Sequence, residues 1–503
     1  MAIGLVGTGS AIPQDGAREQ PATLIWTVIS LLCLITALLP FVLPAIPIGD
    51  DACKHLMVAR VLTDYDNPFL RYFDYFSIQW RPVPTALGDL TLAAFVRMFS
   101  PLAALKAYFI AFAAGLWLSG HFYFKQLGHP GFAVILLLPL LHSFYVFSAF
   151  LPFIGSIALY PLLLGVMIGF PPGLRRSAWL AVILVGLYGF HFVGAAIGCF
   201  TVVMFAVNVK RPRLLWDHLL SIVPCAGLIL YYEVAKPRDT VPPLFHGPLG
   251  QIKAYIAYNV WSLSPTASWL FVALLALFTA AVARHALGGR IVHGRLLVLS
   301  IMLVIVGLFM PYQMGAAFVV GSRTLPFAFI AAGGALKWNP RLLRASIVLV
   351  CVFLAISSVL NTSKALAVQA SYRVFLSGMP TVKPGSRVLP IIEDQTLGGN
   401  KYITPFTGVE DLYNIYRGGA NPYVFAEPLV GTGGNLLRAK YDLSFAFKFS
   451  PHPWRQDYRG VSKNYDYIIC WGRLPTIKPA IASEAPLVFE NGLLSIYGRS
   501  PKF

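Results

Sequence analysis

Two adjacent carboxylates, Asp50 and Asp51, follow directly on the first long apolar stretch of the chain. A helix that begins at this point would place Lys54 one turn from Asp50, and His55 one turn from Asp51. Partial removal from water raises the proton affinity of a carboxylate toward that of a useful general base, whereas a neighbouring ammonium lowers it. These four side chains therefore form a candidate site for proton abstraction. The alternative is a helix N-terminus that is capped by solvated acids.

Acidic residues are concentrated in the segment that contains this pair. Eleven of the 21 acidic residues precede position 371, and five of those eleven lie between positions 46 and 84: Asp50, Asp51, Asp64, Asp66 and Asp74. Charged groups are costly beside lipid unless they serve a substrate or an ion. The concentration therefore favours a functional loop at a membrane surface.

Two other polar side chains interrupt apolar segments. Arg323 lies within Val320–Phe327, where an isolated cation is costly unless it meets an anion or faces a cavity. The alternative for Arg323 is a structural ion pair with a buried acid. His191 lies among aromatic residues within Tyr188–Phe192, where it could line a substrate cavity, transfer a proton or form hydrogen bonds in ordinary packing.

The composition indicates which elements must position these residues. Of 503 residues, 57% are hydrophobic and only 12% are charged, which gives more apolar surface than a soluble fold of this size can enclose. Apolar stretches of about 20 residues predict membrane-spanning helices. We predict a helical bundle with spans near residues 22–43, 85–99, 102–124, 131–150, 152–170, 177–207, 214–231, 267–287, 296–313, 315–335 and 343–361.

Basic residues predict the orientation of these eleven spans. The chain has a net charge of +18, and its basic residues gather in short loops at 210–213, 284–295 and 337–344, as is typical of cytoplasmic loops. The N-terminus would then lie in the cytoplasm, and the loop 46–84 and the carboxyl end would lie outside. Because the basic clusters adjoin apolar spans, they do not predict a nucleic-acid partner.

Two of the predicted spans fit this count poorly. The span at 85–99 is short and contains a carboxylate, Asp89, and the span at 177–207 is long enough to contain a break. Arg175 and Arg176 would also lie outside, against the charge rule. We therefore expect eleven to thirteen helices.

The composition changes near residue 371. Ten of the 21 acidic residues lie in the last 133 positions, which also contain frequent Gly and Pro. This indicates a membrane domain at 1–370 and a small water-exposed α/β domain at 371–503. Short strands are predicted at 387–392 and 465–470, and a hairpin that turns at Asn491-Gly492 is predicted at 487–497.

An acidic pair that opens the first external loop, many helices and a carboxyl-terminal extracytoplasmic domain resemble the GT-C superfamily of polyprenyl-phosphate-sugar glycosyltransferases. Protein O-mannosyltransferases and the lipid A aminoarabinose transferase are the members compared. The resemblance covers the architecture of nearly the whole chain, and its one motif is Asp50-Asp51, where these members more often have Asp-Glu. It implies that Asp50 deprotonates an acceptor hydroxyl while Asp51 orients the acceptor or holds a cation, or that the two residues exchange these roles.

The resemblance also implies the substrates and their contacts. A sugar would move from a polyprenyl-phosphate carrier to a lipid, glycan or protein acceptor at the outer face of the cytoplasmic membrane. Arg323 and Arg81, which stands beside prolines at the end of the first loop, would stabilise the departing phosphate. For Arg81 the alternative is snorkelling to the interface beside a tryptophan. Lys54, His55 and His191 would contact the substrates.

The sequence does not require a cofactor. It contains no His/Cys set with zinc spacing, no phosphate-binding loop and no nucleotide-binding fingerprint. A divalent cation such as Mg²⁺ or Mn²⁺ could sit on Asp50 and Asp51.

Two other classes of function remain open. A transporter or flippase would need charges near the middle of the membrane, and such proteins often contain repeated halves. A polymerase or ligase of surface polysaccharide has similar chemistry, but its important loop usually lies later in the chain. The acids of this chain crowd the first loop instead.

Overall fold

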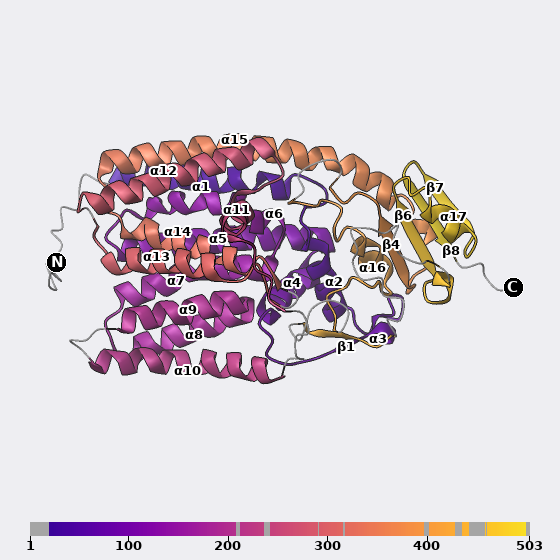
Figure 1. Cartoon of the computed structure of the whole chain (residues 1–503), viewed down its shortest axis with the longest axis horizontal. Coiled ribbons are helices and arrows are strands. Elements are labelled where there is room, and N and C mark those ends of the chain that lie inside the picture. The colour runs from indigo at the N-terminus through magenta and orange to yellow at the C-terminus, as the bar shows by residue number, and fades with distance from the viewer. Residues whose placement is uncertain are drawn as a thin grey trace.

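The computed structural model describes residues 20–207, 212–235, 242–289, 291–314, 317–396, 402–427, 435–441, 458 and 460–498. The molecule is long and narrow. Its helices are aligned along the long axis, and a small sheet lies at one end (Figure 1). We call the end with the sheet the domain end, and the opposite end the far end.

Apolar helices that run between the two ends form a bundle. Six of the described helices are long and apolar enough to cross a membrane. The outer face of α10 exposes large apolar side chains, among them Leu220, Val223 and Leu230 at 60%, 63% and 66%, so lipid rather than water must cover it. The bundle elements are α1 (Gln20–Val42), α5 (Pro101–Gln126), η1 (Gly131–His142), α6 (Phe144–Phe147), α7 (Leu151–Gly169), α8 (Leu174–Phe190), α9 (Phe192–Ala206), α10 (Pro212–Ala235), α12 (Pro265–Leu287), α13 (Gly294–Phe309), α14 (Leu325–Ala335) and α15 (Pro340–Leu376).

Shorter elements connect the bundle helices at the domain end. The first loop contains α2 (Ala52–Thr63), α3 (Tyr72–Tyr75), β1 (Phe76–Ile78) and α4 (Ala86–Met98). Later connections contain α11 (Pro248–Val260), β2 (Gln313–Met314), β3 (Ala317–Phe318) and η2 (Gly321–Thr324).

Helices α5 and α7 run in the same direction. The Tyr108 hydroxyl donates to Leu151 O (2.8 Å), and further along both helices the Ser119 hydroxyl donates to Ala158 O (2.6 Å). The chain between these two helices must therefore cross the bundle in the opposite direction. η1 and α6 make that crossing, as predicted for residues 131–150.

The structure corrects the predicted span at 85–99. Its helix, α4, has 13 residues, and its contacts place it at one end of the bundle and not between the two ends. Leu87 packs against Gly189 near the end of α8, and Gly88 packs against Pro152 at the start of α7. α4 therefore lies at the domain end, beside α2.

The long predicted span at 177–207 is two helices. α8 ends at Phe190 and α9 begins at Phe192, with extended backbone at His191 (φ −163°, ψ 134°) between them. The His191 ring caps α9, because its Nδ1 accepts from Val193 N–H (3.1 Å). The helices then run antiparallel: along α7, Gly155 meets Phe190 of α8 and Ser156 meets Gly194 of α9.

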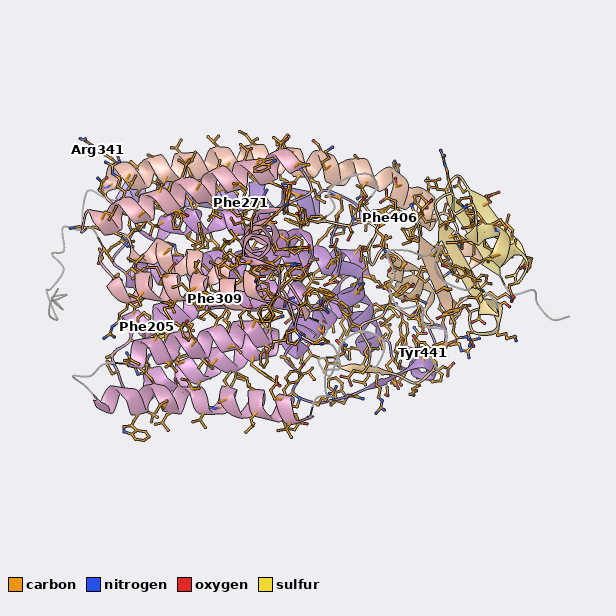
Figure 2. All side chains as sticks on the ribbon, viewed as in Figure 1. Phe205, Phe271, Phe309, Arg341, Phe406 and Tyr441 are labelled. Carbon is orange, nitrogen blue, oxygen red and sulfur yellow. The ribbon has the colours of Figure 1, made fainter. Side chains whose placement is uncertain are left out.

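These two corrections cancel in the number of passes. Within the described residues, α1, α5, η1 with α6, α7, α8, α9, α10, α12, α13, α14 and α15 run between the two ends, which gives the eleven passes predicted. The corrections also move Arg175 and Arg176. The start of α8 now lies at the far end, where Arg341 lies as well (Figure 2), so the conflict with the charge rule disappears.

Helix α15 links the bundle to the C-terminal domain. It has 37 residues, is about 55 Å long and continues past the predicted domain boundary into the domain end (Figure 1). Near its end, Gln369 holds the backbone of Ile46: Ile46 N–H donates to Gln369 Oε1, and Gln369 Nε2 donates to Ile46 O, both at 3.0 Å. The start of the first loop is therefore fixed to α15.

The C-terminal domain is built on a four-stranded sheet with strand order β4-β6-β8-β7. β4 and β6 are parallel, and the other pairs are antiparallel. The predicted hairpin at Asn491-Gly492 is confirmed as β7 and β8. The first loop joins this domain through a separate antiparallel pair, β1 with β5. The domain elements are η3 (Met379–Thr381), β4 (Val388–Ile392), α16 (Asp411–Arg417), β5 (Leu437–Ala439), η5 (Val461–Lys463), β6 (Tyr467–Trp471), α17 (Ile477–Ala482), β7 (Leu487–Asn491) and β8 (Leu494–Gly498).

Candidate active site

Asp51 occupies the N-cap position of α2, but its carboxylate makes no capping hydrogen bond. Backbone groups hold the turn: Asp51 N–H donates to Ser148 O, and His55 N–H donates to Asp51 O, both at 3.0 Å. The carboxylate faces Lys54 instead, whose Nζ lies 3.7 Å from Asp51 Oδ1. The capping interpretation is therefore correct for the position and wrong for the side chain.

A cavity of about 210 Å³ lies beside this turn. Its walls come from α2, the residue before α4, the start of α7, the break between α8 and α9, η2 and the C-terminal domain. The cavity brings together four of the seven predicted site residues. Its lining consists of Asp51, His55, Thr85, Phe150, Pro152, Phe153, His191, Arg323, Phe425 and Asn435.

Asp50 faces the C-terminal domain and does not line this cavity. Its Oδ1 accepts from Thr404 N–H (2.9 Å). Burial raises the pKa of Asp50 to about 8, although the hydrogen bond from Thr404 acts against that rise. Asp50 thus joins the first loop to the domain, and Asp51 is the acid that faces the cavity.

His55 reaches the cavity from the next turn of α2, and Asp89 contacts its imidazole on the side away from the cavity. Its Nδ1 lies 2.8 Å from Asp89 Oδ1, and both side chains are buried. The ring of Phe425 packs edge-on against the imidazole with centroids 5.0 Å apart. A carboxylate on Nδ1 fixes the imidazole tautomer and presents Nε2 for other contacts. Asp89, which interrupted a predicted span, is therefore part of the site.

Arg323 enters the cavity from η2 and lies against His191. Its Nη1 is 2.6 Å from His191 Nε2, and its Nη2 donates to Phe318 O (3.1 Å). The guanidinium also packs on the rings of Phe150 and Phe153, at 5.2 and 5.4 Å from their centroids. Within the described residues no carboxylate lies at ion-pair distance from Arg323. The alternative of a structural ion pair for Arg323 is thus not found there.

The pairing of Arg323 with His191 leaves a hydrogen-bonding conflict. A neutral imidazole carries one N–H, and His191 Nδ1 already accepts from Val193 N–H. In that tautomer Nε2 carries the hydrogen and faces a guanidinium N–H, so two donors face each other. An anion that lies beside both groups would accept from both. This arrangement suits one oxygen of a phosphate.

Arg81 does not line the cavity and forms an ion pair with Glu427 of the C-terminal domain. The side chains of Arg81 and Glu427 are 22% and 12% exposed. The pair holds the end of the first loop on the domain next to the β1–β5 strands. This geometry differs from both sequence interpretations, phosphate contact and snorkelling.

We expect the Arg81–Glu427 pair to act on stability. Arg81→Ala and Glu427→Ala should each lower the free energy of unfolding by roughly 2 kcal/mol, and the double variant should lose little more, because both singles break one pair. Thermal unfolding of the original protein, the two single variants and the double variant in detergent gives this double-mutant cycle. If Arg81 contacts the donor phosphate instead, Arg81→Ala alone raises the KM for the donor.

The carboxylates do not converge into a metal centre. Among the described residues no group of three or more His, Cys, Asp and Glu side chains could hold a metal ion. Asp50 faces Thr404 N–H and Asp51 faces the Lys54 ammonium, so the two acids have separate partners. The divalent cation on Asp50 and Asp51 stays a prediction from the sequence.

Sequence reasoning missed the contributions of the C-terminal domain. Phe425 packs on His55, and the Lys54 ammonium lies 5.3 Å from the centroid of the same ring. Glu410 and Asp411, in the adjacent segment, are buried near Lys54. No local pattern separates these acids from the other acids of a soluble domain. A signal existed only for Asp89, an acid within an apolar segment.

The sequence matches no protein-family model and no curated protein. Two solved structures share its fold. One is ArnT from Cupriavidus metallidurans bound to undecaprenyl phosphate, at 12% identity and a TM-score of 0.56 over 97% of this chain and 99% of that chain. The other is ArnT from the same organism in the apo state, at 10% identity and a TM-score of 0.56 over 95% and 98%. The predicted architecture is confirmed: this chain is a multi-pass membrane protein that shares the fold of ArnT.

Proposed function

We propose that this chain, which has the fold of a GT-C transferase, moves a sugar from a polyprenyl-phosphate carrier to an acceptor hydroxyl. The observation that carries the proposal is the placement of Asp51 and Arg323 on one cavity. A base and a phosphate-binding cation in one cavity are the two groups that this transfer needs. ArnT with undecaprenyl phosphate bound supports a polyprenyl carrier.

Asp51 is the proposed base. Its carboxylate takes the proton of the acceptor hydroxyl, and the oxygen forms a bond to the anomeric carbon of the sugar. The bond between that carbon and the phosphate oxygen breaks, and its electron pair leaves with the polyprenyl phosphate. Attack opposite the leaving phosphate inverts the anomeric carbon. Lys54, at 3.7 Å, orients the carboxylate.

Arg323 and His191 are the proposed contacts of the leaving phosphate. Charge develops on the phosphate oxygen as the bond to the sugar breaks, and fixed donors stabilise that charge most when water is excluded. Arg323 is only 8% exposed and is already fixed by Phe318 O and two aromatic rings. His55, with Asp89 behind it, lies on the Asp51 side of the cavity and would hold the acceptor.

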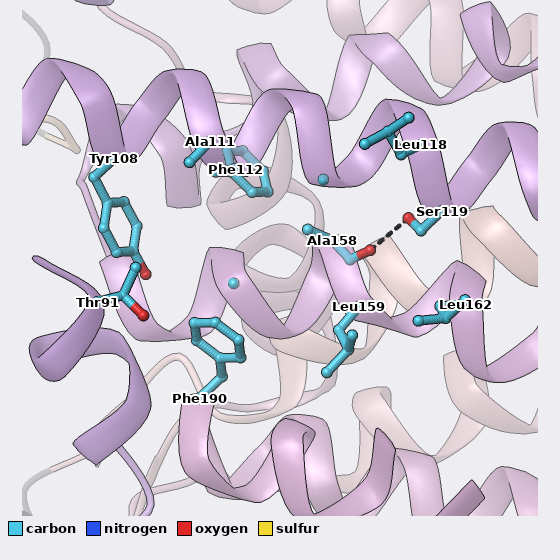
Figure 3. A pocket seen from close by; sticks show the side chains of 12 residues that line it. Thr91, Tyr108, Ala111, Phe112, Leu118, Ser119, Ala158, Leu159, Leu162 and Phe190 are labelled. Carbon is cyan, nitrogen blue, oxygen red and sulfur yellow. Dashed lines mark hydrogen bonds between the residues drawn. The ribbon is translucent and has the colours of Figure 1, made fainter. Parts of the chain in front are cut away.

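A second cavity offers a route for the lipid chain. It has a volume of about 380 Å³ and lies between α5, α7 and the end of α8, with Ala111, Ala158 and Phe190 among its almost entirely apolar walls (Figure 3). Phe190 precedes His191 in the chain. A Cβ atom at Gly155 would overlap the Phe190 ring, so glycine gives that ring its place. The polyprenyl chain would leave the phosphate site along this wall.

The size of the site cavity indicates what reacts there. Pockets that enclose whole drug-sized ligands measure about 300–1,000 Å³. A cavity of about 210 Å³ therefore accommodates the reacting groups, with the lipid chain outside it.

The domain end would face the outside of the cytoplasmic membrane, and Arg175, Arg176 and Arg341 at the far end would face the cytoplasm.

The proposal is tested with purified protein in detergent and a radiolabelled polyprenyl-phosphate sugar. We expect the label to move into a covalent product with an extract of envelope lipids and glycans, and mass analysis then identifies the acceptor. Detergent removes the sealed compartment that transport requires, so bond transfer identifies a transferase. Label that stays on the carrier here, but crosses the membrane of sealed vesicles that contain the protein, would identify a flippase.

A further inference from the structure

The segment 402–427 of the C-terminal domain covers the start of α2. Thr404 N–H donates to Asp50 Oδ1, and Phe425 packs on both Lys54 and His55. Between them Gly408 has a left-handed backbone (φ +82°), and a Cβ atom there would lie 2.7 Å from Asp50 O. The close approach requires glycine. The domain thus forms one wall over the proposed base and its neighbours.

Two acids of this wall, Glu410 and Asp411, are buried. They are 5% and 0% exposed, and in the described residues Glu410 Oε2 and Asp411 Oδ2 have no hydrogen-bond partner. Asp411 is held in place, because its Oδ1 accepts from Asn421 Nδ2 (2.6 Å). A buried carboxylate oxygen without a donor destabilises the fold. The pair therefore does not contribute to stability through hydrogen bonds at these two oxygens.

Lys54 is the cation that these acids act on. Burial alone would lower its pKa, but Asp51, Glu410, Asp411 and Asp50 together raise it. Lys54 lies 3.7 Å from the cavity acid, Asp51, and its side chain also contacts the domain at Gly408, two residues before Glu410. Burial raises the pKa of Glu410 to about 8 and that of Asp411 to about 6.

We propose that Glu410 and Asp411 are positioning residues for the transfer reaction, which act through Lys54 to keep the Asp51 carboxylate in the cavity. The inference rests on the proposed function. With the pair charged, the Lys54 ammonium is shared between the domain and Asp51. Without that charge, Lys54 would be drawn fully to Asp51 and would weaken it as a base.

Other charged and titratable groups also surround Lys54, Glu410 and Asp411, and they affect the pH profile as well. α2 contributes Lys54 and His55 and is preceded by Asp50, the C-terminal domain contributes Glu410 and Asp411, and η2 contributes Arg323. His191 lines the cavity opposite, and Asp89 lies behind His55. Of these groups, the proposed variants change only the pair on the domain.

The test compares three full-length variants, Glu410→Gln, Asp411→Asn and the double variant, with the original protein in detergent. We expect kcat to fall about tenfold in the double variant, with the KM for the donor within about twofold of its original value. The acid limb of the pH profile of kcat/KM should move to lower pH by about half to one unit, because loss of a neighbouring negative charge favours the ionised form of the base. The melting temperature should stay equal or rise, since a buried charge is removed.

Glu490→Gln is the matched control, an exposed acid of β7 in the same domain. It should leave the rate and the pH profile unchanged. A lower melting temperature and a lower kcat with an unmoved acid limb would overturn the proposal and assign the pair a structural role. If the double variant does not fold, each single variant gives the same comparison. If Asp51→Asn retains activity, the assignment of Asp51 as the base is wrong. That result concerns the proposed function and is distinct from the outcomes for Glu410 and Asp411.

Discussion

Replacement of Asp51 by Asn is expected to lower kcat/KM by about three orders of magnitude. Asn keeps the shape of the side chain and its place at the start of α2, but it cannot accept a proton. Initial rates of sugar transfer by the purified variant measure the loss. Because the cavity and the Arg323 contacts are unchanged, the KM for the donor should change far less than kcat.

Two other variants make this prediction specific. Asp66→Asn, an exposed acid in the same loop, should retain full activity. Asp50→Asn should reduce activity less than Asp51→Asn, because Asp50 faces Thr404 N–H and not the cavity. If Asp50→Asn abolishes transfer while Asp51→Asn retains it, the base is Asp50, the first of the two assignments that the sequence left open.

The second large effect is expected at Arg323. Arg323→Gln should lower kcat/KM by about 10²–10³-fold, because it removes a fixed donor from the place where phosphate charge develops. Arg323→Lys should recover only part of the loss, since an ammonium lacks the planar fork that lies against His191 Nε2 and donates to Phe318 O at once. Inhibition by free undecaprenyl phosphate gives an independent readout, and it should weaken in both variants.

The control for Arg323 is Arg341→Gln, at the far end of the bundle (Figure 2). It changes the net charge by the same amount and should leave both the rate and the inhibition constant unchanged. Equal inhibition of the original protein and Arg323→Gln by undecaprenyl phosphate would place the phosphate elsewhere and leave Arg323 as a packing residue on Phe150 and Phe153.

The sequence predicts the bundle well, because an apolar stretch near a basic loop is a strong local signal. Its one error, the span at 85–99, and the break that it left open within 177–207 concern segments where tertiary contacts decide. Asp89 cannot be placed from α4 alone, since its partner His55 lies 34 residues earlier. The break at His191 depends on a ring that caps the next helix, which composition does not reveal. Both segments lie at the cavity, where polar residues interrupt apolar helices.

The candidate site was predicted in part for the same reason. Asp51, His55, His191 and Arg323 are polar residues in or beside apolar segments, and each lines the cavity. Glu410, Asp411 and Phe425 belong to a soluble domain in which acids and aromatics are ordinary. Their role comes only from the packing of that domain on α2, which involves residues more than 300 positions away in the chain. Periodicity and composition carry no information on such contacts.

The pairing of β1 with β5 also has a consequence for biogenesis. Ser77 and Arg438 are partners across 361 positions, so the first loop cannot reach its final form until about seven eighths of the chain has been synthesised. A ribosome would complete every bundle helix before it makes the part of the C-terminal domain that lines the cavity, Phe425 and Asn435. The nascent protein would therefore remain inactive in the membrane until its C-terminal domain is complete. A chain that stops at the end of α15 would lack the cavity wall that this domain supplies.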